Sequence, residues 1–234
     1  MTDVKPRPRQ SRRMQAQATR RRIVDSAYQL FSEYGYPATT MDMIASAAGV
    51  AVQTVHYVFR TKAALFQEVV EVAAAGTHDR SPVMNRPWIA EALSAPAGRR
   101  AIAVGVEHGV DIYVRVAPLN SAIQAAASID PDIEEYSKSI REARRGGMGG
   151  LIEALAAKHQ LRPDLTVERA ADLMFVIHSH ETYLGLTRDS NWSLVEYKAW
   201  LYATLCEQLL SREALSREAR SATRDLSFHH LLSG

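Results

Sequence analysis

The sequence predicts an all-α fold in which an N-terminal group of three helices precedes a larger helical region. Apolar residues recur every three or four positions through most of the 234 residues, and no segment alternates as a strand would. Glycine and proline stand where these periodic segments stop, as they do at helix ends. The basic residues are concentrated near the N-terminus, so the two regions also differ in charge.

The charge asymmetry suggests an anionic partner. Residues 1–62 contain ten lysines and arginines and four acidic residues, whereas the rest of the chain contains 18 basic and 22 acidic residues. A positive segment on a negative body suggests that the segment meets a polyanion, although a solvated basic tail has the same composition. Residues 1–16, with Pro6, Pro8 and five basic residues, are expected to form a flexible arm.

Three helices are expected between residues 17 and 59. The first begins near Thr19 and stops at Gly35, because glycine favours the left-handed conformation of a C-cap. Thr40 is a suitable N-cap for the second helix, which Gly49 ends. The third covers residues 51–59, and a fourth helix follows it directly.

Longer helices are expected beyond a proline-containing connector. Ser193 and Glu196 have the spacing of a capping box at the start of the last strong helix. The glycines between residues 146 and 150 predict a kink or a close helix–helix approach. Residues 212–234 are expected to form a polar tail. The predicted helices cover residues 88–93, 99–116, a short segment from Pro118, 131–158, 166–186 and 193–210.

Residues 44–58 have the spacing of a helix-turn-helix. Ala45 is small where two helices cross, and Gly49 supplies the positive φ of the turn four residues later. Val55 then points inward from the second helix, which in such a motif lies in the major groove of DNA. Gln53 and Thr54 of that helix can hydrogen-bond base edges.

Phosphate contacts are expected from two further places. Lys62 lies in the first turn of the fourth helix, where free N–H groups favour an anion. The arginines at 20–22 are expected to bind phosphate as well.

The order and spacing of residues 31–65 are specific. They include Phe31, Gly35, Thr39, Thr40, Ile44, Ala45, Ala48, Gly49, Val50, Thr54, Val55, Phe59, Lys62 and Leu65. With these residues, the segment from about 17 to 77 resembles the DNA-binding domain of the TetR/AcrR family of transcriptional regulators, with the helix-turn-helix at about 40–59. The resemblance implies DNA contacts at Thr40, Gln53, Thr54, His56, Tyr57 and Lys62.

Three residues depart from the family pattern. Ala51 stands where a serine or threonine N-cap is usual, and Val58 stands where tyrosine or histidine is common. His56 stands where a phosphate-binding tyrosine is usual, so Tyr57 becomes a candidate for that contact.

The resemblance also implies the role of residues 78–211. They would form a helical effector-binding and dimerisation domain, and a small-molecule ligand would release a homodimeric repressor from a double-stranded DNA operator. Candidate pocket residues are Tyr113, Met148, Met174, Phe175 and His178. The last two strong helices would pair with their symmetry mates, or their apolar residues would be buried within the monomer. These residues are Tyr183, Leu184, Trp200, Leu201, Leu205 and Leu209.

Other classes of protein are disfavoured. Cys206 is the single cysteine, and the sequence has neither a signal peptide nor an apolar run of about 18 residues, so a cytoplasmic protein without a membrane partner is expected. His178 and His180 are two residues apart and would face different directions on one helix, so no metal site is expected. No catalytic residues and no cofactor are expected, because no nucleophile–base arrangement and no phosphate-binding glycine loop occur.

Three alternatives remain at this level. The N-terminal helices could serve protein contacts alone, or the chain could be a DNA-modifying enzyme or an architectural DNA-binding protein without a ligand. An interior cavity within residues 98–210 would favour the ligand sensor over the last two.

Overall fold

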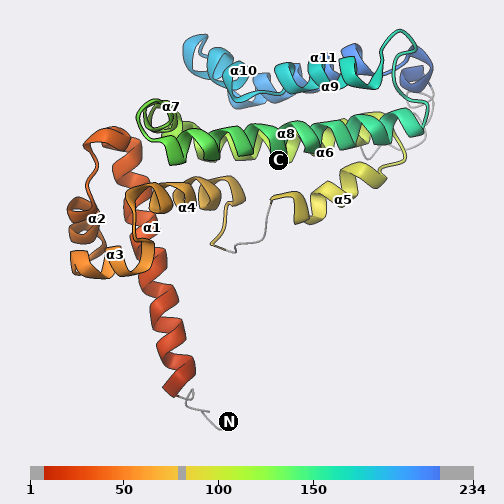
Figure 1. Ribbon diagram of the computed structural model, residues 1–234. Helices are drawn as coiled ribbons and strands as arrows, with labels where there is room; N and C mark the ends of the chain where they lie inside the picture. Colours follow the sequence, from red (N-terminus) through yellow and green to blue (C-terminus); the bar gives the residue numbers. More distant parts are fainter. Residues whose placement is uncertain (1–7, 79–82, 217–234) are drawn as a thin grey trace. The chain divides into compact units, whose positions relative to one another are not determined.

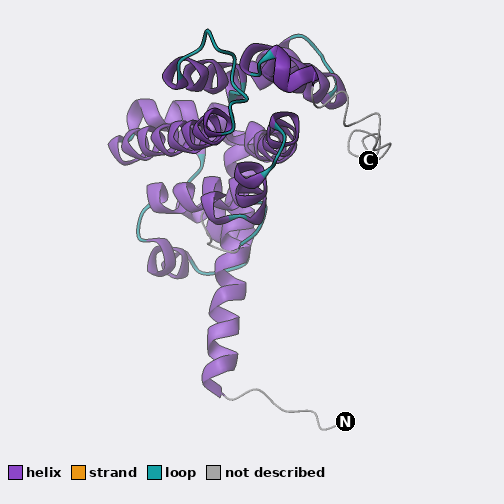
Figure 2. Ribbon diagram, turned by 90° about the vertical axis from the view of Figure 1, so that its right-hand side faces the viewer, coloured by secondary structure: helices purple, strands orange, loops and turns teal. Residues whose placement is uncertain are grey.

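The structure, a computed structural model, describes residues 8–78 and 83–216, and its regular elements are helices (Figures 1 and 2). An isolated bridge joins Leu161 to Leu210. Two units are distinguished by their internal contacts. The N-terminal unit comprises Met1–Arg80 and Arg115–Ser139, and the C-terminal unit comprises Ser81–Val114 and Ile140–Gly234. Within the described residues, no helix has the length and apolar character needed to cross a bilayer.

The first helix, α1 (Pro8–Ala38), begins earlier than the sequence predicts. Residues 8–16, expected in a flexible arm, are helical, whereas residues 1–7 lie outside the described part of the chain. Proline is suited to the first turn of a helix, and the glutamine, arginine, methionine and alanine residues that follow have high helix propensity. The expected break at Gly35 is present as a kink, with φ 77°.

Three short helices follow α1 and share its core. They are α2 (Met41–Ala48), α3 (Val52–Phe59) and α4 (Lys62–Ala75). Ile23, Ile44 and Val55 are fully buried between them. The rings of Phe31 and Phe66 meet edge to face, with centroids 4.8 Å apart. This packing fixes the helix-turn-helix on α1 and α4.

The N-terminal unit also contains residues that the sequence assigns to the second domain. The 3₁₀ turn η2 (Ala117–Leu119), α7 (Asn120–Ile129) and the start of α8 (Pro131–Ala157) contribute Leu119 and Ile133 to the same core. The Tyr36 hydroxyl also donates to Asp130 Oδ2 at 2.6 Å. The domain boundary expected between residues 77 and 78 therefore differs from the division into units. Helical periodicity shows that a face is apolar but not which helix covers it.

Arg115 closes the C-terminal end of α4. Its guanidinium donates to the carbonyls of Ala73 and Ala74, at 2.8 and 2.9 Å. The last carbonyls of a helix have no partner within the helix and carry partial negative charge, so an arginine stabilises them. The Tyr28 hydroxyl donates to the Arg115 carbonyl at 3.0 Å, which joins α1 to the same place.

The C-terminal unit is built from the remaining helices. They are η1 (Val83–Asn85), α5 (Pro87–Ser94), most of α6 (Gly98–Val116), the rest of α8, α9 (Val167–Ile177), α10 (His180–Leu184), the π-helical turn η3 (Gly185–Asp189) and α11 (Leu194–Leu209). Gly105 of α6 lies against Leu151 of α8, and α9 packs on α11. The expected capping box of Ser193 and Glu196 begins α11.

Two predictions about this unit are wrong. The helix expected over residues 166–186 is broken, because Ser179 caps a new helix by accepting a hydrogen bond from the Thr182 N–H. The helix α8 runs on through its glycines, and a Cβ placed at Gly146, Gly149 or Gly150 would meet nothing within 4 Å. The expected close approach is therefore absent at these three glycines.

Of the predicted tail, residues 212–216 are helical and residues 217–234 lie outside the described part.

Candidate nucleic-acid interface and ligand site

The turn between α2 and α3 has the geometry that the sequence predicts. Gly49 is left-handed, with φ 62°, and its N–H donates to the carbonyls of Ala45 and Ser46. The Val50 N–H donates to the Ala45 carbonyl at 3.0 Å, which completes a glycine C-cap. At the other end of α2, Thr40 accepts a hydrogen bond from the Met43 N–H. The Thr40 hydroxyl is exposed and keeps its own proton for an external acceptor.

The recognition helix, α3, has one buried and one exposed side. Val55 and Phe59 are buried in the core, which turns Gln53, His56 and Tyr57 outward. Tyr57 is 88% exposed, unusually high for a large aromatic side chain. Thr54, predicted as a base contact, is half-buried, and its N–H donates to the Ala51 carbonyl. As expected, Ala51 gives α3 no side-chain cap.

Lys62 has internal partners in place of the free ammonium group that the sequence suggests. Its Nζ donates to the carbonyls of Tyr36 and Thr39, at 2.9 and 3.2 Å, and lies 4.3 Å from the centre of the Tyr36 ring. Burial lowers the pKa of Lys62, and the negative charge of Asp130 partly opposes that shift. Lys62 therefore joins the α1–α2 connection, and with it Thr40, to the first turn of α4.

Arg20 also has internal partners. Its guanidinium forms a two-pronged ion pair with Glu68 of α4, in which Nε donates to Oε1 at 2.6 Å and Nη2 pairs with Oε2. The same group lies 4.4 Å from the centre of the Phe59 ring. The sequence does not indicate this partner for Arg20, whereas Arg21 and Arg22 are exposed. The phosphate contacts expected at these three arginines stay predictions.

Arg60 is a candidate DNA contact that the sequence prediction missed. It follows the last residue of α3, is exposed, and has φ 56° and ψ −53°. The Thr61 N–H donates to the Phe59 carbonyl at 2.5 Å, so Arg60 is the central residue of a γ-turn of the rare, strained kind. Strained residues are concentrated at functional sites. A lone basic residue ahead of the Thr61 N-cap was the signal available in the sequence.

Replacing Arg60 with glycine should separate strain from charge. Arg60→Gly should raise the free energy of unfolding by about 1 kcal/mol, because glycine adopts positive φ without a steric penalty. It should also reduce the slope of log affinity for DNA against log salt by about 0.9, the value for one phosphate. Urea unfolding and binding titrations measure the two effects. Arg60→Ala should show the same reduction in the salt slope without the gain in stability. Equal free energies of unfolding for the two variants would contradict the presence of backbone strain at Arg60.

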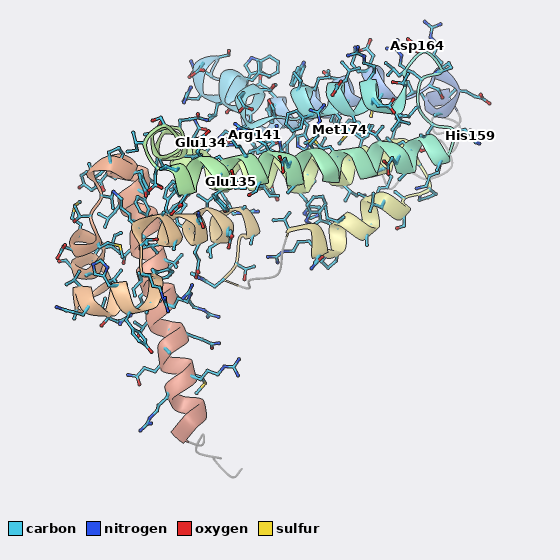
Figure 3. All side chains as sticks on the ribbon, in the orientation of Figure 1. Glu134, Glu135, Arg141, His159, Asp164 and Met174 are labelled. Carbon is cyan, nitrogen blue, oxygen red and sulfur yellow. The ribbon has the colours of Figure 1, made fainter. Side chains whose placement is uncertain are left out.

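The predicted pocket residues divide into those with defined contacts and those that are only buried. The Tyr113 hydroxyl donates to the His178 carbonyl at 2.8 Å, and the ring centroids of the two residues are 5.3 Å apart. The Arg144 guanidinium lies 3.9 Å from the centre of the Phe175 ring and 3.4 Å from the Tyr113 hydroxyl. Met148 and Met174 are buried on α8 and α9, where Met174 is labelled in Figure 3.

The break at Ser179 brings His178 and His180 to the same tyrosine. The sequence places both on one helix, facing different ways, but His178 ends α9 and His180 begins α10. Both rings now contact Tyr113, with centroids 5.3 and 5.5 Å away. Even so, no group of three His, Cys, Asp or Glu side chains within residues 8–78 and 83–216 is placed to hold a metal ion.

His178 is a buried polar group without a partner. The residue is 4% exposed, and neither ring nitrogen has a hydrogen-bond partner among the described residues. Burial, with a smaller effect of the Arg144 charge, lowers the pKa of His178 to about 4, so the ring is neutral at neutral pH. A neutral imidazole offers one donor and one acceptor. Tyr197, linked to this cluster through Tyr183, likewise has a buried hydroxyl without a partner among the described residues.

The residues predicted for a dimer interface are mostly buried within the single chain. Leu201, Leu205 and Leu209 are fully buried, and Tyr183 and Leu184 nearly so, whereas Trp200 is half-buried. Burial within the monomer therefore accounts for all of these residues except Trp200. The large apolar residues that α9 and α11 expose are instead Val176, Leu194 and Val195.

Comparison with known proteins agrees with this geometry. Residues 23–69 match the model of the family described as "Bacterial regulatory proteins, tetR family". The chain is 28% identical over 160 residues to the uncharacterized HTH-type transcriptional regulator YdeS of Bacillus subtilis, covering 68% of this chain and 75% of that protein.

Solved structures share the fold over most of the chain. The SmeT–triclosan complex superposes with a TM-score of 0.66 at 17% identity, covering 84% of this chain and 94% of that one. NalD, the secondary repressor of the MexAB-OprM multidrug efflux pump in Pseudomonas aeruginosa, gives a TM-score of 0.57 at 17% identity, covering 82% and 95%. Regulators of the tetR family are not enzymes. With its helix-turn-helix on α2 and α3 and helices matching those of such regulators, the chain is a DNA-binding transcriptional regulator of the TetR family.

Proposed function

We propose that the chain is a homodimeric repressor that binds a near-palindromic operator and is released from it by a small molecule. The observation that carries the proposal is the two-sided recognition helix, whose core residues are buried while Gln53, His56 and Tyr57 face outward. A helix exposed in this way enters the major groove, and two copies about 34–36 Å apart read successive half-sites. NalD, a repressor of similar fold, supports repression rather than activation.

In this proposal the DNA contacts have different roles. Gln53 reads a base edge, because glutamine pairs with adenine through two hydrogen bonds. Thr54, the next residue of α3, supplies a second base contact. Thr40, His56 and Tyr57 hold phosphates, which position the protein without reading sequence. Lys62 acts through its bonds to the α1–α2 connection, which fix the place of Thr40.

The dimer would form through α9 and α11. Val176 and Val195 are 65% and 71% exposed on these helices, and a second copy would remove them from water. Each protomer would then present one recognition helix.

The ligand would bind at the cluster of Tyr113, Phe175 and His178. Aromatic rings and the buried imidazole offer apolar surface together with a hydrogen-bonding group, which suits an aromatic compound with one polar substituent. The SmeT complex with triclosan, a protein of similar fold, supports a small aromatic effector.

Release of DNA would pass through α6. Tyr113 and Arg115 are two residues apart on this helix, and Arg115 holds the C-terminal carbonyls of α4. A ligand that favours a different position of Tyr113 would shift Arg115 as well. Such coupling requires only that the ligand bind one conformation more tightly than the other.

Selection of bound sequences from a random pool tests the proposal. Wild-type protein should enrich an inverted repeat, because two symmetric heads bind. Gln53→Ala should change the preferred base at one or two positions, at about 1–3 kcal/mol for each lost pair of bonds. Tyr57→Phe is the matched control, and it should lower affinity while leaving the preferred sequence unchanged. A direct repeat or a single half-site would contradict the dimer, and an altered preference in Tyr57→Phe alone would contradict the assigned roles.

A further inference from the structure

The N-terminal extension of α1, residues 8–22, precedes Ile23, the first residue of that helix in the core. Residues 12–18 are all exposed. In Figures 1 and 2 this part of α1 continues past α2 and α3, with no other described helix beside it. Residues 12–18 therefore present an exposed surface on every side of the helix, whereas Arg20 packs against Phe59 and Glu68.

The charge of the extension indicates what that partner is. Arg12, Arg13, Arg21 and Arg22 are exposed, and residues 8–24 contain no acidic residue. Side chains with nitrogen at their tips project from this part of the helix in Figure 3. The two pairs of arginines lie about two helical turns or more apart, so positive charge extends along this part of α1. A polyanion complements such a surface.

The position of Arg20 relates the extension to the recognition helix. Arg20 lies against Phe59 of α3 and Glu68 of α4, so its side of α1 is the side next to the end of α3. Arg13 is seven residues earlier, about two helical turns, and therefore lies on nearly the same side, about 10 Å further along the axis. Arg12 is its neighbour. The exposed arginines thus continue the surface of the recognition helix.

We propose that the extension is a second DNA-binding element, in which Arg12 and Arg13 bind phosphates beside the groove that α3 occupies. This inference rests on the proposed function, since it requires α3 to lie in that groove. Phosphate contacts carry no sequence information, so the extension adds affinity and salt dependence without changing the operator that is preferred. Binding by the extension therefore requires the charges of Arg12 and Arg13 and no particular base sequence.

The test compares two pairs of substitutions that remove the same charge. Arg12→Gln/Arg13→Gln keeps high helix propensity at exposed positions, and Arg141→Gln/Arg169→Gln changes exposed arginines of α8 and α9. The first pair should reduce the slope of log affinity against log salt by about 1.8, two phosphates at 0.9 each. Between 0.05 and 0.2 M salt, wild type should then lose about tenfold more affinity than this variant. The second pair should keep the wild-type slope.

Neutral methylphosphonates placed one at a time in the operator locate the contact. In wild type, one or two of them should weaken binding, and in Arg12→Gln/Arg13→Gln the same substitutions should have no further effect. Equal slopes for wild type and this variant, or an equal loss in the Arg141→Gln/Arg169→Gln control, would overturn the inference. So would unchanged DNA binding together with lost binding to phosphatidylserine vesicles, which would assign the extension to a membrane surface. Failure of wild type to bind any DNA would instead contradict the proposed function.

Discussion

Replacing Arg20 with methionine should lower the free energy of unfolding by about 3 kcal/mol, among the larger effects expected in the N-terminal unit. The Glu68 side chain is 10% exposed, and the Arg20 guanidinium neutralises it through two parallel contacts. Removing one member of a buried ion pair costs about 3–5 kcal/mol, and the lower end applies because the Arg20 side chain is 32% exposed. Urea unfolding followed by circular dichroism measures the change.

Two further variants identify the cause of that loss. Arg20→Met/Glu68→Leu should be more stable than Arg20→Met alone, because apolar residues of similar volume replace a buried pair at little cost. Arg21→Met removes an exposed arginine from the same turn and should change stability by no more than about 0.5 kcal/mol. If Arg20→Met and Arg21→Met were equally stable, Arg20 would have no structural role and could again be considered a phosphate ligand.

Replacing Gly109 with alanine should destabilise the C-terminal unit and disturb the proposed ligand site. A Cβ at this position would lie 2.4 Å from His178 Cε1 and 2.6 Å from Nε2, closer than packed atoms allow. His178 is buried and its ring cannot move into solvent without breaking its packing. Overpacking of this kind costs about 1–3 kcal/mol.

Gly105→Ala is the matched control on the same helix. Its Cβ would lie 3.7 Å from Leu151 Cδ2, an ordinary contact, and alanine is favoured over glycine within a helix by about 1 kcal/mol. Gly105→Ala should therefore stabilise the protein, and Gly109→Ala should be less stable than it by about 1–3 kcal/mol. In a His178→Ala background, Gly109→Ala should lower the free energy of unfolding by less than it does in the wild-type protein. An undiminished cost would show that His178 is not what the new methyl group meets.

Local signals in the sequence determined the secondary structure where a single residue decides the backbone. Gly49 and Gly35 adopt the positive φ that ends or kinks a helix, and Thr40 and Ser193 cap the helices that follow them. The helix-turn-helix could be predicted for the same reason, because its spacing is set by residues close together in the chain. Its outward face, with Gln53, His56 and Tyr57, follows from helical periodicity once Val55 is placed inward.

Tertiary structure decided every feature that depends on residues far apart in the sequence. Arg20 and Lys62 are basic residues in a basic segment, and only the folded chain shows that Glu68 and the carbonyls of Tyr36 and Thr39 are their partners. The sequence suggested phosphate contacts for both because charge alone does not specify a partner. The same physical reason applies to Leu201, Leu205 and Leu209. An apolar helix face is suited equally to the monomer core and to a dimer interface, and packing within the chain covers it here.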